Sequence, residues 1–211
     1  MKKSIFIRSA ATAFLCLVLF NYTLANTPKA EGYKVGDQAI SFQLKNVDGK
    51  MVSPADYQSA KGFIVIFTCN TCPYSKLYES RIEALNQKYA SKGYPVLAIN
   101  SNDMTKQPGD SFEEMVKTSN AGEYSFPYLY DESQEIATAY GATKTPHVYV
   151  LEKNKKNLQV KYIGAIDNNA RDEKSATDKY VENAVDALLA NKPVSTTSTK
   201  AIGCTIKWKE A

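Results

Sequence analysis

The sequence predicts an α/β fold, a three-layer sandwich in which a mixed β-sheet carries helices on both faces. Two observations lead to this prediction. An apolar run over 63–67, a helix-favouring segment and a second apolar run over 95–100 follow one another, which is the order strand, helix, parallel strand. A strand, a hairpin and an amphipathic helix come later, so a β-α-β unit precedes a β-β-α unit.

The first expected elements are a hairpin and a long helix. Segments 39–44 and 51–52 flank the turn sequence Asn46-Val-Asp-Gly49, which is typical of a β-hairpin. A helix is expected over 73–90, with Pro73 in its first turn, where its missing N–H is not needed. Its expected inward face comprises Leu77, Ile82, Leu85 and Tyr89.

Capping signals and a proline mark the second half of the chain. Ser111 opens a capping box, and Asp131 repeats the signal before a short helix over 136–140 that Gly141 closes. A strand over 143–151 is entered through Pro146. A turn over 154–157 then leads into a partner strand over 158–163. The last helix is expected to bury Val181, Val185, Leu188 and Leu189.

The N-terminus predicts the compartment. Basic residues precede an apolar run over 10–20 and small residues at 23–25, a pattern typical of a secretory signal peptide over 1–25. An uncleaved anchor is the alternative, although the run is short for a membrane span. We expect a secreted or periplasmic protein with one folded domain over 26–194, a C-terminal tail over 195–211, and no stable membrane insertion after cleavage.

Charge argues against nucleic acid as a partner. The whole chain has 26 basic and 22 acidic residues, and loss of three basic residues with the signal peptide leaves a net charge of about +1. A nearly neutral protein offers no electrostatic attraction for nucleic acid or an anionic membrane.

Cys69 and Cys72 form a C-x-x-C pair where the first apolar strand meets the helix, the edge of an α/β sheet at which chemistry collects. Free N–H groups and the helix dipole favour a thiolate there, and we expect Cys69 to be the nucleophile and Cys72 the resolving thiol. A stabilising disulfide is the first alternative, but so short a loop stabilises little. A Cu(I) site completed by His147 or Cys204 is the second alternative.

These residues resemble the thioredoxin superfamily, in which an apolar strand ends in C-x-x-C and a Thr-Pro pair, here Thr145-Pro146, opens a later strand. Further segments resemble its secreted redoxin, or peroxiredoxin-like (AhpC/TSA-like), branch: Val35-Gly-Asp37, Asn100-Ser-Asn-Asp103, Phe126-Pro-Tyr-Leu-Tyr-Asp131 and Gly203-Cys-Thr-Ile-Lys-Trp208. The resemblance implies a thioredoxin-like sandwich in which Pro146 is cis beside the cysteines. It also implies that Thr145 pairs with an extended substrate.

The sequence also departs from that pattern. The threonine that true peroxiredoxins place three residues before the reactive cysteine is Ile66 when counted from Cys69, and only Arg81 and Arg171 follow the signal peptide. The strand over 63–67 lacks the buried acid of thioredoxins, which leaves the proton acceptor for the resolving thiol unidentified.

The resulting expectation is a secreted thiol–disulfide oxidoreductase that uses Cys69 and Cys72, needs no cofactor or metal, and acts on protein thiols or disulfides with a redox partner protein. A thiol peroxidase using Cys69 and a Cu(I) metallochaperone are the alternatives. His147 and Cys204 are accessory candidates. His147 either tunes a thiol or is a strand residue with a satisfied hydrogen bond. Cys204 either forms a transient disulfide with Cys69 or sits in a tail that packs on the body through Trp208.

Overall fold

The protein, seen in a computed structural model, is described over residues 31–155 and 157–210, so the predicted signal peptide lies outside the described residues. Its strands are β1 (Gln38–Ala39), β2 (Leu44–Asn46), β3 (Met51–Val52), β4 (Gly62–Phe67), β5 (Val96–Asn100), β6 (Tyr128–Tyr130), β7 (Lys144–Thr145), β8 (His147–Asn154), β9 (Asn157–Gly164) and β10 (Cys204–Thr205). Its α-helices are α1 (Pro73–Tyr89), α2 (Phe112–Ala121), α3 (Glu135–Tyr140) and α4 (Tyr180–Leu189).

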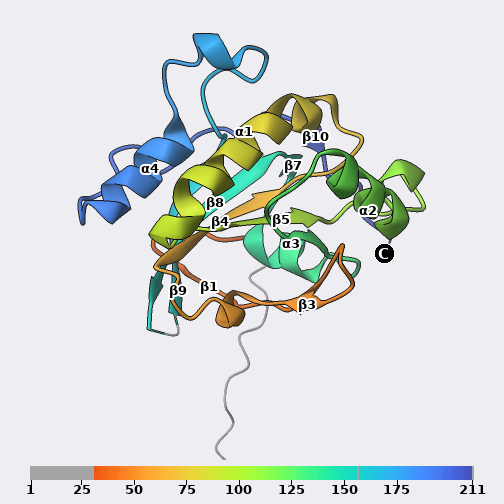
Figure 1. The fold of residues 1–211 in the computed structure, drawn as a ribbon, viewed down its shortest axis with the longest axis horizontal. Coiled ribbons are helices and arrows are strands. Elements are labelled where there is room, and N and C mark those ends of the chain that lie inside the picture. Colours follow the sequence, from red (N-terminus) through yellow and green to blue (C-terminus); the bar gives the residue numbers. More distant parts are fainter. Residues whose placement is uncertain (1–30, 156, 211) are drawn as a thin grey trace, which may run out of the picture.

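An eight-stranded mixed sheet forms the middle layer, with the order β1-β9-β8-β4-β5-β6-β2-β3. The β4-β5 and β5-β6 pairs are parallel, and the others are antiparallel. Figure 1 shows α1 and α4 over one face of the sheet and α3 on the other. The predicted α/β class, with a mixed sheet and helices on both faces, is therefore confirmed.

Strand β4 explains why the sheet needs helices on both faces. All six of its residues are buried. Ile64 and Ile66 join the core beneath α1 and α4, whereas Phe63, Val65 and Phe67 join the core around α3. Because side chains alternate along a strand, a continuous apolar run must be covered from both sides.

Helix α1 runs over Pro73–Tyr89, close to the predicted bounds, but its inward face is rotated from the prediction. Leu77 is 46% exposed, whereas Tyr78 is buried in its place. Tyr78, Ile82, Leu85 and Tyr89 follow one another at intervals of four, three and four residues, which keeps them on one helical face. Leu77 lies one position off that face.

The strand expected over 39–44 is two separate strands. β1 pairs with β9 at one edge of the sheet, and β2 pairs with β6 near the other. Phe42, which lies between them, is buried in the core around α3, so the chain crosses under the sheet from one edge to the other. The predicted hairpin is present, with Leu44 paired to Val52, and Gly49 adopts the positive φ of 84° that its turn requires.

The two predicted capping signals are present in modified form. The Ser111 side chain accepts the N–H of Glu114 and caps α2. Asp131 accepts the N–H groups of Ile136 and Ala137 at the start of α3, although the N-cap position is Gln134. These caps fix the two helices that follow β5 and β6.

Strands β7 and β8 flank a cis Thr145–Pro146 bond, as the resemblance implied. β8 pairs with β4 on one side and β9 on the other, and α4 packs Val181, Val185 and Leu188 against this part of the sheet. Within the described ranges, no helix is long and apolar enough to span a membrane.

The C-terminal tail docks along the sheet and does not hang free. Ser198 forms a parallel bridge with Ile163, and the Thr199 hydroxyl bonds to the Tyr162 hydroxyl at 2.6 Å. Beyond this point β10 pairs with β7, so that Cys204 lies opposite Thr145. The threonine-rich start of the tail is thus hydrogen-bonded to β9.

Candidate active site

The loop between β4 and α1 carries both cysteines and is held by a buried carboxylate. One oxygen of Asp110 accepts the N–H of Asn70 at 2.7 Å and that of Thr71 at 3.2 Å. The other oxygen accepts the Thr71 hydroxyl and the Asn102 amide at 2.8 and 2.7 Å. Asp110 is fully buried, and four donors compensate its charge. The loop backbone is therefore fixed next to the sulfurs.

A second set of contacts fixes the side chain of Asn70. The Tyr128 hydroxyl donates to its Oδ1 at 2.8 Å, and its Nδ2 donates to the carbonyl of Gly109 at 2.9 Å. Strand β6 and the short turn η3 (Pro108–Asp110) therefore both hold the residue that follows Cys69.

Cys72 is the N-cap of α1, because the helix begins at Pro73. Its sulfur, in a residue only 2% exposed, lies 3.4 Å from the amide nitrogen of Cys204 and 3.1 Å from the carbonyl oxygen of Thr145. The pKa of Cys72 is lowered, first by a hydrogen bond from the Cys69 thiol and then by contacts with Cys204 and the N–H of Ser75, although burial opposes them.

The hydrogen bond between Cys72 and the Thr145 carbonyl exists only while the Cys72 thiol carries its proton. A protonated Cys72 thiol donates to the Thr145 carbonyl, which cannot donate in return. On deprotonation this contact is lost, and the sulfur keeps the N–H of Cys204, at 3.4 Å, as a donor. The neighbouring Cys69 thiol, first, and the contact with Cys204 lower the pKa of Cys72.

Cys69 has the opposite environment. Its sulfur contacts the Thr145 hydroxyl at 3.3 Å and the Ser75 hydroxyl at 3.9 Å. The pKa of Cys69 is raised, first because its thiol hydrogen-bonds to the Cys72 sulfur, then by burial and by the negative charge of Asp110. The direction of this pKa shift favours the proton on Cys69.

The pKa directions of the two thiols are opposite to the roles expected from the sequence. That expectation placed Cys69 nearest to the free N–H groups of the helix and Cys72 one turn deeper. In the structure Cys69 precedes the helix by several residues, so the N–H groups of the first turn face Cys72. The helix begins at Pro73, as predicted, so Cys72 is its N-cap and Cys69 lies in the loop before it.

The edge of Thr145, where an extended substrate was expected to pair, carries β10. Cys204 is the register partner of Thr145, and Thr205 that of Lys144. Gly203 lies so close that a Cβ atom there would stand 2.1 Å from the Thr145 carbonyl oxygen. Only glycine allows the tail this approach to the Thr145–Pro146 peptide.

His147 is a buried strand residue whose Nδ1 accepts the N–H of Thr143 at 3.3 Å and whose ring contacts Tyr149. Burial lowers the pKa of His147 to about 4, which keeps the ring neutral near pH 7. These contacts agree with the interpretation of His147 as a strand residue with a satisfied hydrogen bond.

Asp110 was not among the residues predicted from the sequence, because its only signal was an acid after Pro-Gly in a loop far from the cysteines in the chain.

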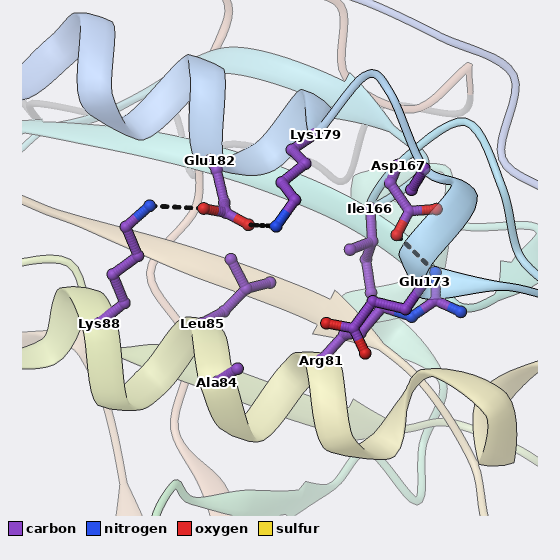
Figure 2. A pocket seen from close by; sticks show the side chains of 10 residues that line it. Arg81, Ala84, Leu85, Lys88, Ile166, Asp167, Glu173, Lys179 and Glu182 are labelled. Atoms are coloured by element: carbon purple, nitrogen blue, oxygen red, sulfur yellow. Dashed lines mark hydrogen bonds and ion pairs between the residues drawn. The ribbon is translucent and has the colours of Figure 1, made fainter.

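The cavity between α1 and α4 lies apart from the thiols, and its charges pair with one another. Figure 2 shows Arg81 paired with Asp167, and Glu182 lying between Lys88 and Lys179. Arg81 also donates to the carbonyls of Asn169 and Ala170, at 2.8 and 2.9 Å. Over 31–155 and 157–210, no group of three or more His, Cys, Asp or Glu side chains is placed to hold a metal ion.

Comparisons with known proteins agree with this geometry. Residues 35–161 match the AhpC/TSA family. The thiol-disulfide oxidoreductase ResA of Halalkalibacterium halodurans is 23% identical over 127 residues, which are 60% of this chain and 68% of that protein.

Solved structures extend the similarity. The crystal structure of an uncharacterized conserved protein from Geobacillus kaustophilus has a TM-score of 0.78 and 39% identity, covering 84% of this chain and 94% of that one. The exposed lipoprotein thioredoxin of Streptococcus pneumoniae has a TM-score of 0.51 and 20% identity, covering 72% and 99%. The similarity to the pneumococcal thioredoxin concerns the fold alone, and it confirms the thioredoxin-like sandwich.

Proposed function

The chain belongs to the AhpC/TSA family, and we propose that it is an extracytoplasmic thiol–disulfide oxidoreductase acting through Cys69 and Cys72. The observation that carries this proposal is the paired thiol environment at the start of α1. The Cys72 sulfur accepts the N–H of Cys204 and its pKa is lowered, whereas the pKa of the adjacent Cys69 thiol is raised. One ready thiolate and one adjacent thiol are what disulfide exchange requires.

The reaction proceeds in two exchanges. The Cys72 thiolate attacks one sulfur of a substrate disulfide, which forms a mixed disulfide and releases the other substrate sulfur as a thiolate that takes up a proton. Cys69 then loses its proton and attacks the Cys72 sulfur, which closes the Cys69–Cys72 disulfide and releases the second substrate thiol. Two electrons pass from the cysteine pair to the substrate, and the reverse sequence oxidises a dithiol.

Protein thiols and disulfides are the proposed substrates, with a dithiol protein as the redox partner. The similarity to ResA, named a thiol-disulfide oxidoreductase, supports this class of reaction. An extended substrate that pairs with Thr145 must displace β10, because that edge is already occupied. Thr145 and Pro146 therefore form a substrate groove only when the tail has moved.

Location outside the cytoplasm is the second part of the proposal. The basic and apolar pattern over 1–25 supports it, and so does the likeness to a pneumococcal protein named an exposed lipoprotein thioredoxin. Disulfides form and persist in such an oxidising compartment, so a protein that exchanges disulfides has substrates there.

Reduction of insulin by dithiothreitol tests the activity. The wild-type protein should accelerate precipitation of the insulin B chain, and Cys72→Ser should reduce the rate to the uncatalysed level. Leu77→Ala, at an exposed position on the same helix, is the matched control and should keep wild-type activity. Full activity in Cys72→Ser, or no acceleration by the wild type, would refute the proposal.

A further inference from the structure

The third thiol of the described chain lies at the reactive sulfur. The Cys204 amide nitrogen is 3.4 Å from the Cys72 sulfur. Burial, first, and the neighbouring Cys72 sulfur raise the pKa of Cys204 to about 11, so the Cys204 thiol is protonated in the resting site. One of the two alternatives from the sequence paired Cys204 with Cys69, whereas the structure places the Cys204 backbone at Cys72.

The position of Cys204 is fixed from both sides. On the N-terminal side, Gly203 packs against the Thr145–Pro146 peptide, where no Cβ would fit. On the C-terminal side, Ile206 is 2% exposed in the core around α3, and the N–H of Lys207 donates to Asn102 at 2.9 Å. Docking on both sides holds the Cys204 thiol beside one sulfur and removes the entropic cost of bringing it there.

More contacts tie the tail to the loops around the site. The carbonyl of Lys207 accepts the N–H of Asp103 at 2.9 Å and the Gln134 amide at 2.8 Å, and Gln134 accepts the N–H of Lys209 at 2.8 Å. Figure 1 shows β10 and β7 together near the first turn of α1. A strand so extensively anchored has a defined position relative to Cys72.

We propose that Cys204 is a second resolving thiol for Cys72, delivered by the docked tail strand, so that the site also cycles through a Cys72–Cys204 disulfide. The inference rests on the proposed function, in which Cys72 forms mixed disulfides. In this step the Cys204 sulfur loses its proton and attacks the Cys72 sulfur of a mixed disulfide. The Cys72–Cys204 bond forms, the bond to the substrate breaks, and the departing substrate thiolate takes up a proton.

The two resolving thiols have different consequences for the substrate groove. A Cys69–Cys72 disulfide does not involve β10, because both cysteines lie at or before the start of α1. The tail strand can therefore still separate from Thr145. Closure of Cys72–Cys204 ties β10 covalently across the same edge. The second form therefore excludes an extended substrate until a dithiol reductant reopens it.

The test uses the full mature chain with Cys69→Ser and oxidised glutathione as the disulfide. Reduced protein is mixed with excess glutathione disulfide, quenched with acid and an alkylating agent at intervals, and examined by intact mass and peptide mapping. A glutathione adduct should appear on Cys72 and then be replaced by an intrachain Cys72–Cys204 link, at a rate independent of protein concentration. The double variant Cys69→Ser, Cys204→Ser should keep the adduct.

Two results would overturn the inference separately. If the adduct on Cys72 persists equally in the single and double variants, Cys204 does not resolve it, although the proposed function stands. If no adduct forms on Cys72 in either variant, the proposed function fails and the inference fails with it.

A third variant tests delivery by the docked strand. Gly203→Ala in the Cys69→Ser background should push β10 off the Thr145–Pro146 peptide and slow loss of the adduct about tenfold or more. Lys200→Ala, at an exposed position in the same tail, is the matched control and should leave the rate unchanged. An unchanged rate in Gly203→Ala, with the circular dichroism spectrum preserved, would show that docking does not deliver the thiol.

Discussion

The carboxylate of Asp110 accepts the backbone N–H of Asn70 at 2.7 Å, inside the protein and one residue after Cys69. The same carboxylate binds the backbone and hydroxyl of Thr71, so both residues between the cysteines depend on it. Its negative charge also raises the pKa of Cys69, after the contribution of the Cys72 hydrogen bond and of burial. Asp110 therefore links the shape of the loop to the proton on Cys69.

Asp110→Asn should destabilise the reduced protein and lower the pKa of Cys69. An amide offers one acceptor oxygen where the carboxylate offers two, so buried donors lose their charged partner, at a cost of roughly 2–3 kcal/mol. Urea unfolding measures the loss. Asp186→Asn, on an exposed carboxylate of α4, is the control and should change stability little. Equal stability of Asp110→Asn and wild type would show that the carboxylate does not hold the loop.

Cys72 should be the first thiol to be alkylated in reduced protein at about pH 6. Its lowered pKa leaves a larger thiolate fraction there than in an ordinary cysteine of pKa about 8.5, and the thiolate is the form that reacts. Limited iodoacetamide treatment followed by peptide mapping gives the order, and a Cys204→Ser background removes the third thiol. Faster labelling of Cys69 would restore the roles inferred from the sequence.

The single histidine of the chain should make stability depend on pH between about 6.5 and about 4. His147 is neutral in the folded protein down to about pH 4, whereas in the unfolded chain it takes up a proton near its ordinary pKa. The unfolded state therefore binds more protons in this window, and stability falls as pH falls, by up to about 3 kcal/mol from this group.

His147→Asn, whose side-chain oxygen can still accept the N–H of Thr143, should remove that part of the pH dependence. Urea unfolding of both proteins at about pH 7 and about pH 4.5 measures the difference, and carboxylates that titrate in both proteins cancel. An identical pH dependence in the two proteins would mean that the ring is already protonated when folded.

Hydrogen peroxide should be a poor substrate. Thiol peroxidases stabilise the reactive thiolate with an arginine, but here the guanidinium of Arg81 is bound to Asp167 and to two carbonyls, and Arg171 is exposed. Peroxide consumption with dithiothreitol should therefore not exceed that of a free thiol at equal concentration. Rapid, saturable consumption that Cys72→Ser abolishes would favour the peroxidase alternative.

Much of the fold was predictable because its signals are local. The apolar run of β4, Pro73 at the start of α1 and the turn ending at Gly49 each specify an element within a few residues. The division of 39–44 into β1 and β2 was not predictable, because it depends on burial of Phe42 under strands distant in sequence. Leu77 was misplaced because a helical face is decided by packing and not by spacing alone.

The site was predictable in its residues but not in its assignments. The C-x-x-C and Thr145-Pro146 could be recognised by spacing, and the helix was expected to begin at Pro73, yet Cys69 was taken as the thiol at the helix N-terminus, where the structure has Cys72. Asp110 and Cys204 reach the loop from 39 and 132 residues away in sequence, through tertiary contacts that no local pattern records. Long-range contacts of this kind also shift the pKa values of the two thiols, after the larger effect of the thiols on each other.

In the proposed function, Cys69 and Cys72 form an exchangeable dithiol and not a structural disulfide. Equilibration of the Cys204→Ser protein with glutathione buffers of graded ratio, followed by acid quenching and peptide mapping, tests it most directly. We predict one two-electron transition that links Cys69 to Cys72, with a potential between about −270 and about −120 mV, the range of thiol–disulfide oxidoreductases. A potential below about −300 mV, typical of structural disulfides, or failure to form the link would contradict the claim.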